Sequence, residues 1–385
     1  MFRFFPLILK NCLRNRRRTT LTVLSIAASL SLLGVLMALY HAFYFSEPTP
    51  AQALRLVTRN KVSLVFPLPE AYGQKIRAIP GVREVMTDQW FGGLYKNDRP
   101  ENMFARFAIE PDKIFTIRGE MTVPEDQKLA FQRERTACLI GRELAKKFNF
   151  QLGDRITIRG DIFPVTVEFT VRAIFDAPEY TEVLYFHRKY LEEGLGGRMQ
   201  GTAGRFDVLA DSPDSVPRIA REIDEQFRNS TAQTKTEPER AFQLAFVNAM
   251  GNVKMFLLSI CAAVTFTMLL VSANTMAMSV RERVREVGVL KTLGFTREGI
   301  LGMMLGEAVV VSFIGGALGL GLATGLCFLV RQAPAFISQL KVLSIQPPVA
   351  LACLGVAMFI GLASALAPAL GASRTPIVEA LRSAD

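Results

Sequence analysis

The chain has 385 residues, half of them apolar, and a formal net charge of +10 at pH 7. Its apolar residues are concentrated in a few long blocks flanked by basic residues, which argues against a soluble protein and favours a membrane protein over a nucleic-acid-binding one. Five cysteines and two histidines, His41 and His187, match no metal-site spacing, and only Cys138 lies in the polar middle of the chain. We therefore expect neither metal catalysis nor an internal disulfide in that part.

The N-terminal segment, residues 1–19, carries six basic residues and no acid. Residues 1–13 mix apolar and basic side chains, which suits an amphipathic segment at the membrane surface or an ordinary leader. Residues 20–45 carry no formal charge; they are long enough to cross a membrane and too long for the apolar core of a cleaved signal peptide. The positive-inside rule predicts a first span with its N-terminus in the cytoplasm.

Residues 46–252 have scattered charges and frequent proline and glycine, and we predict a folded α+β domain outside the cytoplasm. The sequence pattern in the first part of this domain predicts a strand over 61–66, a helix over 69–79 and a strand from Val82. Its end predicts a strand over 206–210, a helix over 213–228 and an extended return over 232–236. Two β-α-β units that flank an insertion indicate a split, ferredoxin-like lobe.

The insertion, about residues 111–201, predicts a second, strand-rich lobe. Residues 141–148 have a helical pattern, and residues 155–159 and 165–175 alternate as half-buried strands do. Residues 238–252 predict a helix that leads towards the second span.

Three further spans are predicted at residues 253–280, 300–330 and 347–371. Between them lie a charged cytoplasmic segment at 281–299 and a periplasmic loop at 331–346, and a cytoplasmic tail follows at 372–385. The predicted fold class is therefore an α-helical membrane protein with four transmembrane helices and a large α+β extracytoplasmic domain. Both termini are expected in the cytoplasm, because the inner segments are richer in Lys and Arg.

No catalytic motif is present: the chain lacks G-x-S-x-G, H-E-x-x-H and G-x-x-x-x-G-K-[ST]. We therefore expect a non-enzymatic subunit, and any ATP that powers it must bind another polypeptide. Glu307 is the only acid within a predicted span and lies near its end. A structural role facing a neighbouring helix is favoured over a proton relay, which argues against an ion-driven carrier.

Two further groups of residues are candidates for contacts. Gly302 and Gly306, and likewise Gly315 and Gly319, are spaced four apart in the third span and predict helix packing or a dimer face, although glycine is common in such helices. Trp90, Phe91 and Tyr95 form an aromatic cluster that fits either a contact with a hydrophobic ligand or partner protein, or an ordinary buried core.

The charged stretch at 280–298, VRERVREVGVLKTLGFTRE, places Val280, Val284 and Val287 on one helical face and charges over the remainder. This pattern alone leaves two interpretations open, a docking element for a soluble partner and a solvated loop between spans.

The same stretch resembles the cytoplasmic signature of the MacB/FtsX/LolC-type (type VII) ABC transporter permeases, E-R-x-x-E-I-G-x-L-[KR]-[AT]-[LI]-G-[AF]. The leader R-N-x-x-R-[RT], the IPGV at 79–82, the glycine-rich third span and the ending R-T-P-I-V-E-A-L-R are also similar to this family. The matching residues of the signature and the ending are Glu282, Arg283, Glu286, Gly288, Leu290, Lys291, Leu293, Gly294, Arg374, Pro376, Glu379, Ala380, Leu381 and Arg382.

The resemblance implies a permease of the bacterial inner membrane that works by mechanotransmission. It also implies that the split β-α-β lobe is porter-like and that the inserted lobe is strand-rich. ATP and Mg²⁺ would be bound by two copies of a separate ATPase, and this chain would hold no cofactor. A second permease subunit, identical or paralogous, and a periplasmic adaptor are further expected partners. The implied coupling residues are Glu282, Arg283, Arg285, Glu286, Gly288, Leu290, Lys291 and Gly294.

The substrate class is not settled by the resemblance. Export or envelope handling of a hydrophobic, peptide or lipoprotein substrate is expected from the family and from the size of the outer domain. The alternative is a transmembrane regulator that activates an envelope enzyme without transport.

Overall fold

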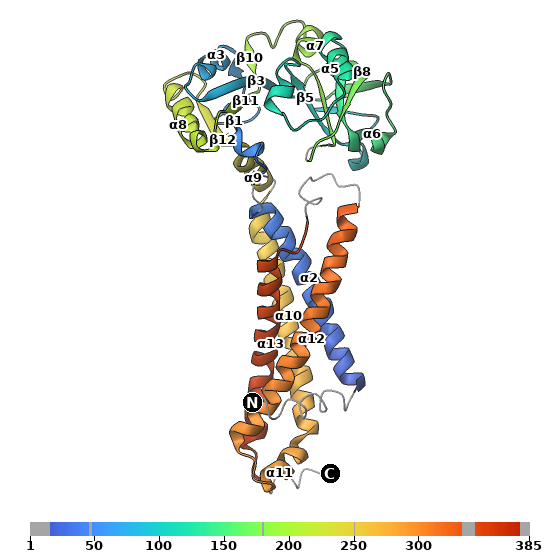
Figure 1. Ribbon diagram of the computed structural model, residues 1–385, viewed down its shortest axis with the longest axis vertical. Coiled ribbons are helices and arrows are strands. Elements are labelled where there is room, and N and C mark those ends of the chain that lie inside the picture. The colour runs from blue at the N-terminus through green and yellow to red at the C-terminus, as the bar shows by residue number, and fades with distance from the viewer. Residues whose placement is uncertain (1–15, 46–47, 179–180, 250, 333–342, 378–385) are drawn as a thin grey trace. The chain divides into compact units, whose positions relative to one another are not determined.

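The computed structural model describes residues 16–45, 48–178, 181–249, 251–332 and 343–377. The chain divides into two compact units (Figure 1). Residues 1–46 and 250–385 form one, called the helical unit here, and residues 47–249 form the other, called the sheet domain. The predicted amphipathic leader, most of the 331–346 loop and the matching residues 379–382 lie outside the described residues.

The helical unit contains four helices that are long and apolar enough to cross a membrane, among the residues described. Their ends lie within a few residues of the predicted span bounds, while the side of the membrane that each end faces stays a prediction. A shorter helix, α11, lies between the second and third of them. The bounds are α2 Arg16–Tyr44, α10 Val253–Glu282, α11 Val284–Thr292, α12 Arg297–Gln332 and α13 Pro347–Arg374.

Small residues bring α2 and α12 close together. A Cβ atom added to Gly319 would lie 2.7 Å from the Ala27 carbonyl oxygen, and one added to Gly315 would lie 2.8 Å from Ile26. Close backbone approach of this kind is the usual role of small residues between membrane helices. Gly315 and Gly319 thus pack against the first helix of their own chain, whereas a packing role for Gly302 and Gly306 stays a prediction.

The sheet domain is built on one ten-stranded sheet, with an additional two-stranded sheet formed by β10 and β2. The order in the large sheet is β12-β1-β11-β3-β5-β9-β6-β8-β7-β4. The strands are β1 Arg55–Asn60, β2 Leu68–Pro69, β3 Val82–Trp90, β4 Gly93–Leu94, β5 Ala105–Ile109, β6 Ala137–Gly141, β7 Arg155–Gly160, β8 Thr166–Phe175, β9 Val183–His187, β10 Thr202–Ala203, β11 Arg205–Ala210 and β12 Thr234–Pro238.

Helices cover both faces of this sheet (Figure 1). The described helices of the domain are η2 Gln52–Leu54, α3 Ala71–Arg77, η3 Pro100–Asn102, α4 Ile114–Ile117, α5 Glu125–Arg133, α6 Arg142–Phe148, α7 Arg188–Gly194, η4 Pro213–Ser215, α8 Val216–Gln226 and α9 Glu239–Ala249.

The sheet has two halves that meet between β3 and β5. The terminal half (β12, β1, β11 and β3) contains the units β1-α3-β3 and β11-α8-β12. The predicted split pair of β-α-β units is therefore present, with β1 in place of the predicted strand over 61–66. The inserted half consists of β5, β9, β6, β8, β7 and β4. Only three register pairs join the halves, from Asp88 opposite Ile109 to Trp90 opposite Phe107.

The central strands of the inserted half, β6 and β9, are buried on both faces. Cys138 and Ile140 of β6 belong to a cluster with Leu144 of α6, whereas Ala137 and Leu139 belong to a cluster with Phe131 of α5. Successive side chains of a strand point to opposite faces, so β6 is a central strand between two apolar layers. A central strand buried on both sides is nearly continuous in apolar residues, and ACLIG in β6 fits that description.

Two details differ from the predictions. Residues 61–66 form no strand, because β1 ends at Asn60, whose Oδ1 accepts a hydrogen bond from the Val62 amide at 3.0 Å. Such side-chain bonds turn the backbone away from a sheet, and Val62 and Val65 are left 78% and 77% exposed. The inserted half also begins before residue 111, because β5 already pairs with β9, and it continues the sheet of the terminal half.

Candidate functional site

The coupling segment, residues 281–299, contains the short helix α11, which is separated from α10 and from α12 by a break at each end. Helix α10 ends at Glu282 and α11 begins at Val284. At its other end, Gly294 has φ +89°, its amide donates to the Lys291 carbonyl, and the Phe295 amide donates to the Leu290 carbonyl, both at 3.1 Å. This pair of bonds is the Schellman motif, which requires a left-handed residue and so favours glycine.

The inner side of the coupling segment is anchored to the other helices. Val287 is buried at 3% exposure, and Gly288 is also buried. Arg283 pairs with Glu307 of α12, its Nη1 atom 2.5 Å from Glu307 Oε2. Lys291 Nζ donates to the Thr375 carbonyl oxygen, just beyond α13, at 2.5 Å. The segment is therefore tied to both α12 and the end of α13.

The outer side of α11 presents apolar and basic groups to solvent. Val289 is 47% exposed and Leu293, which caps the helix, is 71% exposed. Arg285 is exposed on the same short helix. A soluble partner that docks here would meet two apolar side chains and a cation.

The predicted coupling residues thus differ in their surroundings. Arg283 and Lys291 hold the segment against its neighbours, Gly288 is buried, and Gly294 makes the turn. Glu282 and Arg285 are exposed, and Glu286 and Leu290 are half-buried. Val289 and Leu293 are not among the coupling residues predicted from the sequence. Both lie off the helical face that carries Val284 and Val287, and an apolar residue outside that face is the signal that could have identified them.

The predicted aromatic cluster is not brought together as one surface. Phe91 is fully buried in the core of the inserted half, and Tyr95 packs edge-on against Phe104, Phe148 and Phe150. Only Trp90 is exposed, at 50%. A shared contact surface of the three residues is therefore excluded, and Trp90 alone stays a candidate.

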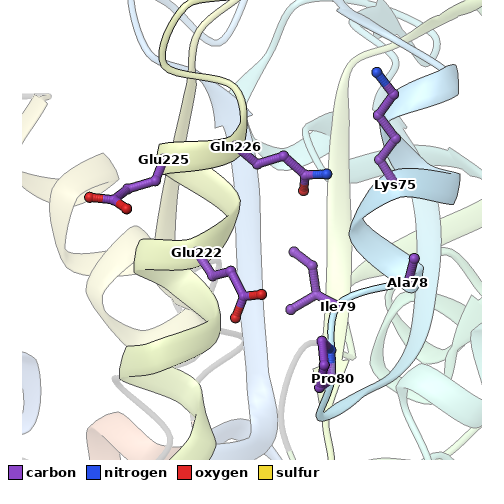
Figure 2. A pocket seen from close by; sticks show the side chains of 7 residues that line it. All are labelled: Lys75, Ala78, Ile79, Pro80, Glu222, Glu225 and Gln226. Carbon is purple, nitrogen blue, oxygen red and sulfur yellow. The ribbon is translucent and has the colours of Figure 1, made fainter.

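The sheet domain also has a hollow of about 410 Å³ between the end of α3 and α8. Figure 2 shows Glu222 and Gln226 of α8 directed towards Ile79 and Pro80, while Glu225 points away. Lys75 is the only cation that lines it. Its lining is mixed in charge and offers no cluster of groups suited to chemistry.

Comparison with known proteins gives two matches to family models. Residues 19–226 match the model described as a MacB-like periplasmic core domain. Residues 258–377 match the model described as the C-terminal part of FtsX-like permeases. The first alone covers more than half of the chain, and the two together include most of it.

The chain is also similar to individual proteins along much of its length. It is 23% identical to an uncharacterized ABC transporter permease of Methanocaldococcus jannaschii, over 81% of this chain and 80% of that one. It is 28% identical to the uncharacterized ABC transporter permease YknZ of Bacillus subtilis, over 63% and 61%. It is 33% identical to the macrolide export ATP-binding/permease protein MacB of Chromobacterium violaceum, but over only 28% of this chain and 16% of that one.

Two solved domains resemble part of the chain. The extracellular domain of the ABC-type transporter YknZ from Gram-positive bacteria is 14% identical, with a TM-score of 0.35, over 48% of this chain and 99% of that one. The periplasmic region of MacB from Actinobacillus actinomycetemcomitans is 11% identical, with a TM-score of 0.36, over 51% and 93%.

Proposed function

Because the chain belongs to the family of ABC transporter permeases with a MacB-like periplasmic core domain and an FtsX-like C-terminal part, we propose that it couples ATP hydrolysis by a separate ATPase to conformational change of its sheet domain. In this proposal the ATPase binds ATP and Mg²⁺, and this chain supplies no catalytic group. Two ATPase copies and a second permease subunit, identical or paralogous, complete the assembly.

The proposal rests on one observation, which is that the coupling segment is anchored on its inner side and exposed on its outer side. Its inner side is fixed to α12 by the pair of Arg283 with Glu307 and to the residue after α13 by Lys291. Its outer side exposes Val289 and Leu293. A force applied to the exposed side therefore reaches α10, α12 and α13 through direct contacts rather than through a loose loop.

The test of docking uses the exposed side chains, because reversing Arg283 would also break its pair with Glu307. The variant Val289→Ser/Leu293→Ser should reduce co-purification of the ATPase at least tenfold and abolish the effect of this subunit on ATP hydrolysis. Burying a Val or Leu side chain contributes about 1.5–3 kcal/mol, so losing both should cost more than the roughly 1.4 kcal/mol that corresponds to a tenfold change in affinity. The variant should insert and unfold like the wild type, because neither residue is buried.

The matched control is Val62→Ser/Val65→Ser in the sheet domain, which removes two exposed apolar side chains, 78% and 77% exposed, from another place. It should leave ATPase binding unchanged. If Val289→Ser/Leu293→Ser retains full ATPase binding, the docking assignment is wrong. If the wild type binds no ATPase at all, the proposed function is wrong as a whole.

Membrane topology is tested with single cysteines in a background in which the five natural cysteines are replaced. We propose that both termini and the coupling segment face the cytoplasm of a bacterial inner membrane and that the sheet domain faces the periplasm. Leu293→Cys should then react with an impermeant thiol reagent only after the membrane is opened, whereas Val62→Cys should react in intact spheroplasts. The reverse pattern would contradict the proposed orientation.

A hydrophobic, peptide or lipoprotein substrate is the class that we propose for export or envelope handling. The support is the exposure of apolar side chains in the sheet domain: Val62, Val65 and Phe66 lie within five residues of the chain, and Trp90 is 50% exposed. A hydrolysis-deficient ATPase should trap the substrate in the complex, and mass spectrometry would identify it. Recovery of an envelope hydrolase in its place would instead favour the alternative, a regulator without transport.

A further inference from the structure

A chain of buried ion pairs crosses one face of the terminal half of the sheet. Leu56, Phe206 and Val208 point to the face covered by α3 and α8, where they join one apolar cluster. Since strand side chains alternate, Arg55, Arg205 and Asp207 point to the opposite face. Asp88 of β3 lies opposite Arg205 in the register and joins them there.

Seven side chains form this chain of ion pairs, which we call the charge chain: Glu120, Arg55, Glu239, Arg118, Asp207, Arg205 and Asp88. Arg55 reaches Glu120 at 2.7 Å and Glu239 at 2.5 Å. Arg118 reaches Glu239 at 3.2 Å and Asp207 at 3.3 Å. Arg205 reaches Asp88 at 2.6 Å and Asp207 at 3.4 Å. Apart from Glu120 and Arg205, at 23% and 16%, these side chains are at most 7% exposed.

The charge chain joins parts that are far apart in the sequence. Glu239 is the first residue of α9, the helix that precedes α10 in the chain, and Arg55 is the first residue of β1. Asp88 forms the first of the three register pairs between the two halves of the sheet. The Arg205 guanidinium also lies against two rings, Phe107 of β5 at 4.9 Å and Phe242 of α9 at 5.4 Å.

Stability alone does not account for this arrangement. Burying charges is costly, and apolar side chains of similar volume often stabilise a protein as well or better. The charge chain also contains four carboxylates and three guanidinium groups, so one negative charge is in excess when all are ionised. The ion pairs do tie their elements to one another, because a side chain of one segment can keep its partner only if the other segment stays in place.

We propose that the charge chain is the joint that carries displacement of α9 to both halves of the sheet, with Glu239 and Arg118 as the positioning residues that link the helix to the strands. This inference rests on the proposed function only for the source of the displacement. The joint itself is a property of the sheet domain and can be tested without an ATPase.

The test measures amide hydrogen exchange in the full chain in lipid nanodiscs. Glu239→Gln removes the charge that α9 contributes to the charge chain and keeps the shape of the side chain, and Asp88→Asn does the same at the junction between the two halves of the sheet. Each variant should change the exchange of amides in both α9 and the junction, residues 88–90 and 107–109, by about tenfold, since members of one ion-pair network respond together. The double variant should differ from the product of the single effects.

The matched control is Glu182→Gln. Glu182 is a carboxylate of similar burial, 10% exposed, paired with Lys147 in the inserted half and outside the charge chain. It should alter exchange in neither α9 nor the junction. The proposed joint would be refuted if Glu239→Gln changed amide exchange in α9 alone. It would also be refuted if the effect of the double variant equalled the product of the two single effects, as for independent sites.

A second measurement connects the joint to the proposed function. With the ATPase bound, ATP should change the exchange of β5 in the wild type, and Glu239→Gln should reduce that change at least fivefold while still binding the ATPase. Equal ATP responses in the variant and the wild type would refute the joint and leave the proposed function standing. Failure of the wild type to bind an ATPase would refute the proposed function, while the exchange results without ATPase would still decide on the joint.

Discussion

Arg283 donates a hydrogen bond from Nη1 to Oε2 of Glu307 at 2.5 Å, and both side chains are about 15% exposed. Arg283 stands at the break between α10 and α11, and Glu307 lies in α12. This pair confirms that Glu307 faces a neighbouring segment, as its position near the end of the third span predicts. It also shows that a residue of the signature points inward and fixes the angle of the coupling segment.

Reversing this pair should therefore be rescued by reversing both partners. Arg283→Glu should lower the free energy of unfolding by about 2 kcal/mol, because it leaves Glu307 facing a like charge. Arg283→Glu/Glu307→Arg should recover at least half of that loss, measured by thermal unfolding of the detergent-solubilised chain. Arg285→Glu, on the exposed side of the same helix, is the control and should not change unfolding. Equal unfolding of the Arg283 and Arg285 variants would show that the pair contributes nothing.

The close approach of α2 and α12 predicts a position-dependent cost for added side-chain volume. Gly319→Ala should destabilise the helical unit by about 1–3 kcal/mol, because its Cβ atom would lie 2.7 Å from the Ala27 carbonyl oxygen. Gly321→Ala, two residues along the same helix, has no atom within 4 Å of the new Cβ and should be neutral or slightly stabilising. Unfolding in a mild detergent measures both, and an equal effect at the two sites would contradict the predicted packing.

The positive φ of Gly294, just after α11, predicts that alanine and asparagine at this position will have different effects. With φ at +89°, Gly294→Ala should cost about 1 kcal/mol, since residues with a Cβ atom are disfavoured in the left-handed region. Gly294→Asn should cost less, because asparagine tolerates that region better. The stimulation of ATP hydrolysis should fall in the same order, the alanine variant being lower than the asparagine variant. The opposite order would show that the turn does not depend on left-handed geometry.

Hydropathy and periodicity were enough to predict the spans and several elements of the sheet domain. Long uncharged blocks predict the spans. Alternation of polar and apolar residues predicts β7 and β8, as in Arg155–Gly160. The helix over 213–228 was predicted by its apolar spacing at Val216, Ile219 and Ile223, which are all buried. In each case a single face of one element carries the signal.

Features that depend on several elements at once were not predicted. Strand β1, RLVTRN, has a polar sequence, because it contains Arg55 and Arg59. The glutamates that pair with these arginines lie 184 and 178 residues later in the chain, so no local pattern indicates the strand. The exposed VSLVF at 62–66 was read as a strand in its place. The charge chain escaped prediction for the same reason: its members come from five separate segments, and no local spacing connects Asp88 with Glu239.

The last prediction concerns the pH dependence of stability. Burial raises the pKa of Asp88 from 3.8 to about 6, with Asp207 adding to the rise while Arg205 and Arg118 oppose it. Tyr185 of β9 faces the same charges, and its pKa is raised to about 12, mainly by burial. Asp88 therefore takes up a proton more readily in the folded chain than in the unfolded one.

The sign follows from this difference in proton binding. Between pH 4 and 6 the folded state holds a proton on Asp88 that the unfolded state has lost, so this contribution to stability falls as the pH rises and stays low above pH 6. Asp88→Asn should remove that slope. The free energy of unfolding at pH 7.5 minus that at pH 4 should therefore be higher in the variant than in the wild type, by on the order of 2 kcal/mol.

Urea unfolding of the full chain at pH 4 to 7.5 measures the difference between wild type and variant. Taking the difference matters because Glu239 and Glu134 have lowered pKa values, Glu239 through Arg118 and Arg55 despite its burial and Glu134 through its hydrogen bond from Arg172. Both give stability the opposite slope, which the subtraction cancels. Glu182→Gln serves as the control and should keep the wild-type slope between pH 4 and 6. A variant Asp88→Asn with an unchanged slope would show that another carboxylate of the charge chain takes up the proton.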